Sequence, residues 1–171
     1  GKALKISPPE KLKLEKLDIE AALKTRIMIL LIGILVHKFK KFSLPFSGGC
    51  KLGKRTVTPH IYALEKFGIK IKVKEREYKI SRNKLIPGKN IVMYESGDTA
   101  TENTILAAAL IEGKTVIKFA SANYQVQDLC YFLAGLGVKI EGIRTTTLTV
   151  FGKENLNQEY SFQLSEDPIE A

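Results

Sequence analysis

The feature that most constrains the fold of this chain is an internal repeat. Residues 57–71 align with residues 126–140 at a constant offset of 69, and six of the fifteen paired positions are identical, which indicates a duplication. Each copy has the apolar spacing of an amphipathic helix that ends at a glycine, Gly68 or Gly137, where a left-handed backbone is expected. A β-strand should follow each glycine, because the next residues alternate between apolar and polar.

A second, more apolar helix is predicted upstream in each copy, over residues 25–39 and 101–112. Each leads into a predicted strand, at 41–45 and 115–120, and residues 90–95 read as the strand that opens the second copy. The repeat is therefore a βαβαββ unit. Helices that are apolar on nearly every face belong inside a core, so we expect an α/β (α+β) fold with buried helices and the sheets outside them.

The first copy contains an insertion. The upstream helices align at an offset of 76, which is seven more than the downstream pair, and the extra residues fall between Pro45 and Val57. The second copy makes the same connection in a few residues around Ser121 to Asn123. Because the scaffold folds with the short connection, we expect the long one to serve a function.

The inserted loop has the chemistry of an anion site with a reactive thiol. Residues 46–55 contain three glycines, three cations and one cysteine, Cys50. Nearby cations bind anions and lower the pKa of a thiol from about 8.5, so Cys50 is the candidate reactive residue. A nucleotide-binding P-loop is excluded, because the spacing between glycine and Lys54 is too short and no Ser or Thr follows this lysine.

The charge of the chain is unevenly distributed. The formal net charge is +9, but residues 1–90 hold 22 Lys/Arg against 7 Asp/Glu, whereas residues 91–171 hold 5 against 11. The first half should therefore attract anions. No His, Cys or carboxylate spacing of a metal site is present, so we expect no metal and no cofactor.

Cysteine use and hydropathy bear on the compartment. The two cysteines lie far apart in a chain with no signal peptide, which favours a reducing compartment, taken here as the cytoplasm. The longest apolar run, residues 27–36, is half the length of about 20 residues that a membrane span needs, so it reads as a buried helix and no membrane partner is expected. Both ends of the chain look cut, since neither has an initiator Met or a closing cap.

The loop resembles that of the UDP-N-acetylglucosamine enolpyruvyl transferases. The family loop reads Leu-Pro-Gly-Gly-Cys-x-Ile-Gly-x-Arg-Pro-Val-Asp-x-His, and this chain matches it from Leu44 to His60 with Phe46 and Ser47 inserted. The resemblance extends over residues 22–171. Other segments that support it are 24–26, 99–103, 112–117 and 167–171.

The resemblance implies a fold and an activity. The fold is an inverse barrel of βαβαββ repeats, arranged in two domains with the active site between them. The activity is transfer of the enolpyruvyl group of phosphoenolpyruvate to the 3′-hydroxyl of UDP-N-acetylglucosamine, with release of phosphate, in the first committed step of peptidoglycan synthesis. These two small molecules are the expected partners, and no cofactor is implied.

The resemblance also assigns roles to residues. Cys50 takes the role of proton donor to the enolpyruvyl methylene, able to form a covalent phosphoenolpyruvate adduct and to be alkylated by fosfomycin. Arg55 would contact the phosphoenolpyruvate phosphate, and Arg26 the nucleotide sugar, both through a guanidinium fork suited to anions. Two short segments would face the nucleotide, with Thr58 in place of the family aspartate: Thr56, Val57, Thr58 and Pro59 in the first, and Glu95, Ser96, Gly97 and Asp98 in the second.

The resemblance divides the chain into parts. Residues 1–20 would end a preceding repeat or form a frayed tail, 21–90 the repeat with the Cys loop at 45–55, and 91–160 the second repeat. Residues 161–171 would form a strand leading to a second domain that this chain lacks. Because further family arginines, an aspartate base and a lysine lie outside the chain, we expect it to have no turnover alone.

Three alternatives stay open. A basic nucleic-acid-binding module would explain the charge, but the chain has 8% aromatic residues and no Trp, so stacking platforms are not evident and no nucleic-acid partner is expected. A transferase acting on shikimate phosphate shares the repeats but lacks the Gly-Gly-Cys loop. A catalytically inactive homologue would fit the inserted Phe46 and Ser47 and the two acidic residues of the second segment, which would repel a diphosphate.

Other reactive residues are predicted to be structural. Cys130 lies on the packing face of the repeated helix and should be core, as buried free cysteines usually are. His37 is expected to interact with the last carbonyls of its helix, and His60 to be structural or a hydrogen-bond partner. Met28 and Met93 should fill the core. The lysines at positions 38, 40 and 41 read as a solvated face.

Overall fold

The structure is a computed structural model that describes residues 10–25, 27–46, 56–75, 77–156 and 159–166. Helices and strands alternate as the repeat predicts. The helical elements are η1 (Leu14–Lys16), α1 (Ile19–Lys24), η2 (Ile27–Ile29), α2 (Leu31–Lys38), α3 (Thr58–Glu65), α4 (Asp98–Ala109) and α5 (Tyr124–Gly135). The strands are β1 (Lys41–Pro45), β2 (Ile69–Val73), β3 (Glu77–Arg82), β4 (Ile91–Val92), β5 (Gly113–Lys118), β6 (Lys139–Glu141) and β7 (Thr147–Gly152).

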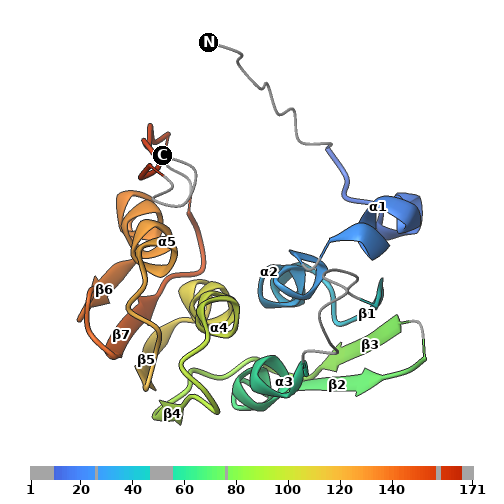
Figure 1. Ribbon diagram of the computed structural model, residues 1–171, viewed down its shortest axis with the longest axis horizontal. Helices are drawn as coiled ribbons and strands as arrows, with labels where there is room; N and C mark the ends of the chain where they lie inside the picture. Colours follow the sequence, from blue (N-terminus) through green and yellow to red (C-terminus); the bar gives the residue numbers. More distant parts are fainter. Residues whose placement is uncertain (1–9, 26, 47–55, 76, 157–158, 167–171) are drawn as a thin grey trace.

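The strands form two sheets with helices between them. One sheet has the order β1-β3-β2 and is antiparallel, and the other has the order β4-β5-β7-β6 with only the β4–β5 pair parallel. Figure 1 shows α2 and α4 side by side between the sheets, and these two helices pack against each other. The predicted arrangement, with buried helices and sheets outside, is confirmed.

The strand registers show that the two repeats are built alike. Ile71 pairs with Ile80, and its repeat counterpart Ile140 pairs with Val150. The next strand in each sheet then places Phe42 opposite Ile80 and Thr115 opposite Val150. The strand order β1-β3-β2 thus corresponds to β5-β7-β6, with β1 and β5 related by an offset of 73.

The connection between β1 and α3 is longer than its counterpart between β5 and α5, as predicted, but the predicted insertion of seven residues is wrong, because the strand registers give an upstream offset of 73 and not 76. The connection holds residues 46–57 in the first repeat and residues 119–123 in the second, a difference of seven. The strands before the connection are related by an offset of 73 and the helices after it by an offset of 69. The first repeat therefore contains four inserted residues. The other three correspond to the first turn of α5, which begins three residues earlier than α3 does in the aligned sequence.

The helix boundaries depart from the prediction in two places. The helix expected at 25–39 consists of η2 and α2, and the hydroxyl of Thr25 accepts a hydrogen bond from Ile27 N at its start. The helix expected at 101–112 is α4, which starts and ends three residues earlier. The glycine ends are as predicted, since φ is 84° at Gly68 and 91° at Gly137.

The tail at 159–166 contains no strand, so the strand predicted over 161–171 is wrong for its described part. These residues lie instead against the side of α5. Tyr160 and Phe162 pack with Phe132, and Ser165 hydrogen bonds to both carboxylate oxygens of Asp128. A strand needs a neighbouring strand to pair with, and the described residues offer none at this position.

The core runs through both repeats without a break. Met28 and Met93 are buried, as predicted, and Cys130 is fully buried. None of the helices in the described ranges combines the length and the apolar character that crossing a membrane requires.

Candidate functional site

The segment before α3 is a compact turn held by its own threonines. The hydroxyl of Thr56 accepts a hydrogen bond from Thr58 N at 3.1 Å and lies 2.6 Å from the Thr58 hydroxyl. Val57 is the N-cap of α3, its carbonyl accepts from two amides of the first turn, and Pro59 occupies the first turn, where a missing N–H costs nothing. Thr58 therefore uses its hydroxyl locally, where the family aspartate would carry a charge.

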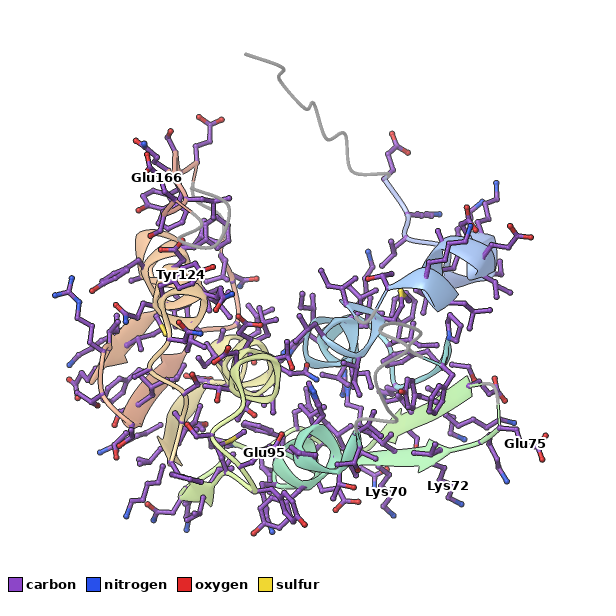
Figure 2. All side chains as sticks on the ribbon, viewed as in Figure 1. Lys70, Lys72, Glu75, Glu95, Tyr124 and Glu166 are labelled. Atoms are coloured by element: carbon purple, nitrogen blue, oxygen red, sulfur yellow. The ribbon has the colours of Figure 1, made fainter. Side chains whose placement is uncertain are left out.

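The segment before α4 begins the second turn of the site. Gly97 is the N-cap of α4, and Ser96 donates a hydrogen bond to Ala120 O at 3.2 Å. Glu95 is exposed and makes no hydrogen bond or ion pair among the described residues. In Figure 2 its label lies at the loop that leads into α4.

The carboxylate of Asp98 is tied to the start of the next helix. Its two oxygens accept hydrogen bonds from the Ser121 hydroxyl and from Asn123 Nδ2, the latter at 3.0 Å. Asp98 is also in the first turn of α4, where a negative charge is stabilised by the helix dipole. Of the two acidic residues predicted to repel a diphosphate, only Glu95 is not engaged in this way.

The two turns are joined by a buried histidine. His60, in the first turn of α3, is 5% exposed. Its Nε2 lies 3.5 Å from the hydroxyl of Thr99, at the outer limit of a hydrogen bond, and its Nδ1 lies 3.1 Å from Asn103 Nδ2. The prediction that His60 is a hydrogen-bond partner is confirmed, and its bonds connect α3 with α4.

Three predicted site residues lie outside the described residues: Arg26, Cys50 and Arg55. Their roles stay predictions. The described turns flank them in the sequence, because Thr56 follows Arg55 directly and Ile27 follows Arg26.

Burial changes the pKa of three groups near the helices. Burial raises the pKa of the Cys130 thiol to about 12, so this cysteine is an inert core residue. Burial, helped by the charge of Asp98, raises the pKa of Glu102 on α4 above its ordinary value. Burial lowers the pKa of His37, and this effect outweighs that of the backbone carbonyls of Leu106 and Ala107, which raise it.

His37 does not serve as the expected partner of the carbonyls that end α2. That role belongs to Arg82, whose guanidinium donates to Val36 O and, at 3.3 Å, to His37 O. The Nε2 atom of His37 is buried without a hydrogen-bond partner in the part of the chain that the structure describes. That part also contains no group of three or more His, Cys, Asp or Glu residues able to hold a metal ion.

Comparison with known proteins identifies the family of this chain. Residues 4–171 match the sequence profile of EPSP synthase (3-phosphoshikimate 1-carboxyvinyltransferase). The chain belongs to this family. Among the described residues, the second repeat has the full βαβαββ order from β4 to β7, and the first has αβαββ from α2 to β3.

Several curated relatives with one shared name resemble this chain. It is 38% identical over 159 residues to the UDP-N-acetylglucosamine 1-carboxyvinyltransferase of Borreliella burgdorferi, a match that covers 92% of this chain and 36% of that protein. It is 39% identical over 146 residues to the protein of the same name from Hydrogenovibrio crunogenus, covering 85% of this chain and 34% of that one. The chain thus spans about a third of the length of these curated relatives.

Solved structures of the family share the fold. The enolpyruvyl transferase NikO from Streptomyces tendae superposes with a TM-score of 0.58 at 19% identity, over 73% of this chain and 29% of that one. EPSP synthase from Acinetobacter baumannii gives a TM-score of 0.54 at 16% identity, over 72% and 28%. These likenesses confirm the predicted fold class.

Sequence reasoning missed three residues that hold the site together: Asn103, Ser121 and Asn123. Asn103 carried a usable signal, since it is an amide on a helix that was predicted to be buried, where a polar side chain needs hydrogen-bond partners. Ser121 and Asn123 gave none beyond their position in a short connection.

Proposed function

We propose that the protein of which this chain is part transfers the enolpyruvyl group of phosphoenolpyruvate to the 3′-hydroxyl of UDP-N-acetylglucosamine and releases phosphate. The observation that carries this proposal is the combination of the Gly-Gly-Cys loop, which the shikimate-phosphate enzymes lack, with 38% identity to a UDP-N-acetylglucosamine 1-carboxyvinyltransferase. In this role the protein belongs to peptidoglycan synthesis and works in the cytoplasm.

The described turns would hold the nucleotide end of the substrate. The segments 56–59 and 95–98 open two neighbouring helices, α3 and α4, and the His60 to Thr99 contact joins them. Backbone N–H groups at the start of a helix can bind a polar or anionic ligand. At α3 the amides of Thr58, His60 and Ile61 already donate within the turn, so this kind of binding would fall to the start of α4. The carboxylate oxygens of Asp98 accept hydrogen bonds from Ser121 and Asn123, so they are engaged within the protein.

Cys50 would supply the proton. A positioned acid protonates the methylene carbon of phosphoenolpyruvate while the sugar hydroxyl, losing its proton to a base, bonds to the neighbouring carbon. Loss of a proton from the resulting methyl group together with phosphate then restores the double bond of the enolpyruvyl group. Arg55 and Arg26 would pair with the negative charges of the two substrates through their guanidinium groups. The first repeat has four residues inserted in this connection, which is longer than its counterpart in the second repeat, and we propose that this added length serves the reactive segment around Cys50.

The test is intact-mass analysis of the full-length protein after treatment with fosfomycin, together with phosphate release from the two substrates. We expect one covalent adduct on Cys50, no adduct in Cys50→Ser, and loss of activity in that variant by about 10²-fold or more. Cys50→Asp should retain activity, because a carboxylic acid can also donate a proton.

Three results would contradict the proposal. Wild-type protein that releases no phosphate would support an inactive homologue, and salt-dependent oligonucleotide binding without binding of UDP-N-acetylglucosamine would support a nucleic-acid module. Phosphate release with shikimate phosphate in place of the nucleotide sugar would assign the other substrate class.

The chain by itself should release no phosphate. It spans about a third of the length of its relatives, and the implied active site lies between two domains. A phosphate-release assay on the 171-residue chain checks this, with the full-length protein as the positive control.

A further inference from the structure

One buried amide on α4 binds three other segments. Asn103 is fully buried. Its Oδ1 accepts from Gly33 N at 2.9 Å, and its Nδ2 donates to Ile29 O at 3.0 Å and contacts His60 Nδ1 at 3.1 Å. The side chain therefore reaches η2, α2 and α3 at once, across 43 to 74 residues of sequence.

These bonds fix the orientation of both side chains. Gly33 N can only donate and Ile29 O can only accept, so the oxygen and nitrogen of Asn103 have one consistent assignment. The second proton of Nδ2 then points to His60 Nδ1, which must be an acceptor, so the neutral ring carries its proton on Nε2. That proton faces the hydroxyl of Thr99, which links the chain of hydrogen bonds to the start of α4.

The backbones of α2 and α4 approach closely for this contact to form. A Cβ atom at position 33 would lie 2.5 Å from both the backbone oxygen and Oδ1 of Asn103. Glycine is therefore required at position 33, and any larger residue would displace the amide.

The scaffold does not need polar residues at these positions. At the repeat offset of 69, the counterpart of His60 is Leu129, and at the strand-derived offset of 73 the counterpart of Asn103 is Leu30. All residues from Ile27 to Ile32 are apolar, so this comparison does not depend on the precise offset. A buried polar network stabilises a protein only if all its members are hydrogen bonded. The other repeat packs with apolar residues at the equivalent positions, so packing alone does not explain Asn103 and His60.

The three bonded segments are those that adjoin the proposed substrate contacts. Ile29 follows Arg26 by three residues, His60 follows the segment 56–59 directly, and Thr99 follows 95–98 directly. One amide and one imidazole thus connect the described stretches of chain that follow these three site segments.

We propose that Asn103 and His60 are positioning residues that hold these three segments in one geometry for the nucleotide-sugar substrate. The identity of the substrate rests on the function proposed above. The mechanical part, that the three segments are held together, rests on the hydrogen bonds alone. A displacement of any one segment would then change the positions of the other two.

The mechanical part is tested by hydrogen–deuterium exchange of the full-length protein without ligand. In Asn103→Leu, which introduces the residue of the twin repeat, we expect faster exchange at 27–33, 56–61 and 95–101 together. The matched control is Thr104→Val, which removes a fully buried hydroxyl next in sequence that bonds within α4 to Ala100 O. Exchange that rises only within α4 in Asn103→Leu, or equally in both variants, overturns the proposal whether or not the protein has activity.

The functional part is tested by steady-state kinetics. His60→Leu should raise KM for UDP-N-acetylglucosamine about tenfold with a smaller change in kcat, because a misplaced binding segment weakens substrate binding. His60→Asn should recover most of this loss, since its Oδ1 can accept from Asn103 as Nδ1 does. Thr104→Val should lower Tm and leave KM unchanged.

The two levels of failure are separable. If wild-type protein does not turn over UDP-N-acetylglucosamine, the proposed function fails, and the exchange experiment still decides the mechanical part. If wild type is active but His60→Leu lowers only Tm, or His60→Asn recovers nothing, the pair is merely structural and the inference is wrong.

Discussion

The two repeats share one scaffold and differ where chemistry is expected. In both, a helix ends at a left-handed glycine and a three-strand ladder follows with the same pairing. The first repeat has a connection seven residues longer and a buried histidine, where the second has Leu129. Duplication thus provides an internal control: what the copies share is needed to fold, and what only one copy has needs another explanation.

The outer faces of the two sheets also differ. On the first sheet, Lys72 stands directly opposite Lys79, and Lys70 and Lys41 lie two residues along the strands on the same face. Figure 2 shows Lys70 and Lys72 projecting from β2 on the side away from α2. The counterparts of Lys72 and Lys79 are Glu141 and Thr149, which pair in the same register. Part of the charge asymmetry of the chain therefore lies on the outer face of this sheet.

The largest contrast is expected between the two cysteines. In native full-length protein, a thiol reagent at neutral pH should modify Cys130 at least about 10³-fold more slowly than Cys50, because burial leaves Cys130 with a pKa of about 12 and cations surround Cys50 in sequence. Mass spectrometry of time points measures both rates, and denatured protein should react at both sites. Equal native rates would contradict the contrast.

A matched pair of core substitutions sharpens the shared part. Leu64 and Leu133 occupy equivalent positions and are 0% and 4% exposed. Leu64→Ala and Leu133→Ala should each lower the free energy of unfolding by about 2–5 kcal/mol, because each leaves a cavity. Denaturant titration measures both. A loss confined to one repeat would show that the copies do not carry the core equally.

A smaller effect concerns pH and the buried His37. Burial lowers the pKa of His37 below 6.5 in the folded protein; the charge of Arg82 also lowers it, and the Leu106 and Ala107 carbonyls act in the opposite direction. The unfolded chain therefore binds this proton more tightly than the folded protein does. The stabilising contribution is complete above pH of about 6.5 and is lost as the pH falls below that value.

Position 37 corresponds to Leu110 in the second repeat, so His37→Leu introduces the residue of the other copy. This variant should reduce the pH dependence of stability. Melting temperature measured from pH 8 to pH 5 should fall less below pH of about 6.5 in the variant than in wild type. A parallel decline in both proteins would assign the acid sensitivity to other groups.

The smallest effect is expected on the sheet face. Lys72→Glu installs the charge found at Glu141 and replaces a like-charge pair by an opposite-charge pair, which should stabilise the protein by about 0.2–1 kcal/mol at low salt. The gain should shrink at high salt, because exposed charges are screened. Lys70→Glu, which faces Ser81 across the strands, is the control and should gain less.

Much of this fold was predictable because its signals are local and occur twice. Helix periodicity, the two glycines at helix ends and the alternation of the strands all survive in one sequence, and they placed β1 within its observed bounds. The predictions were weaker where tertiary contacts decide. The helix at 25–39 is interrupted at its start, and the tail at 161–166 folds against α5 instead of forming a strand.

The site divides along the same line. The sequence by itself determined that Cys50 and Arg55 fall in the segment that is longer in the first repeat, because motif and insertion are both read from the order of residues. Only the tertiary structure decided that Asn103 bonds to Gly33, Ile29 and His60, and that Asp98 faces Ser121 and Asn123. Such contacts depend on how helices pack across 23 to 74 residues of chain, and no local pattern encodes that distance.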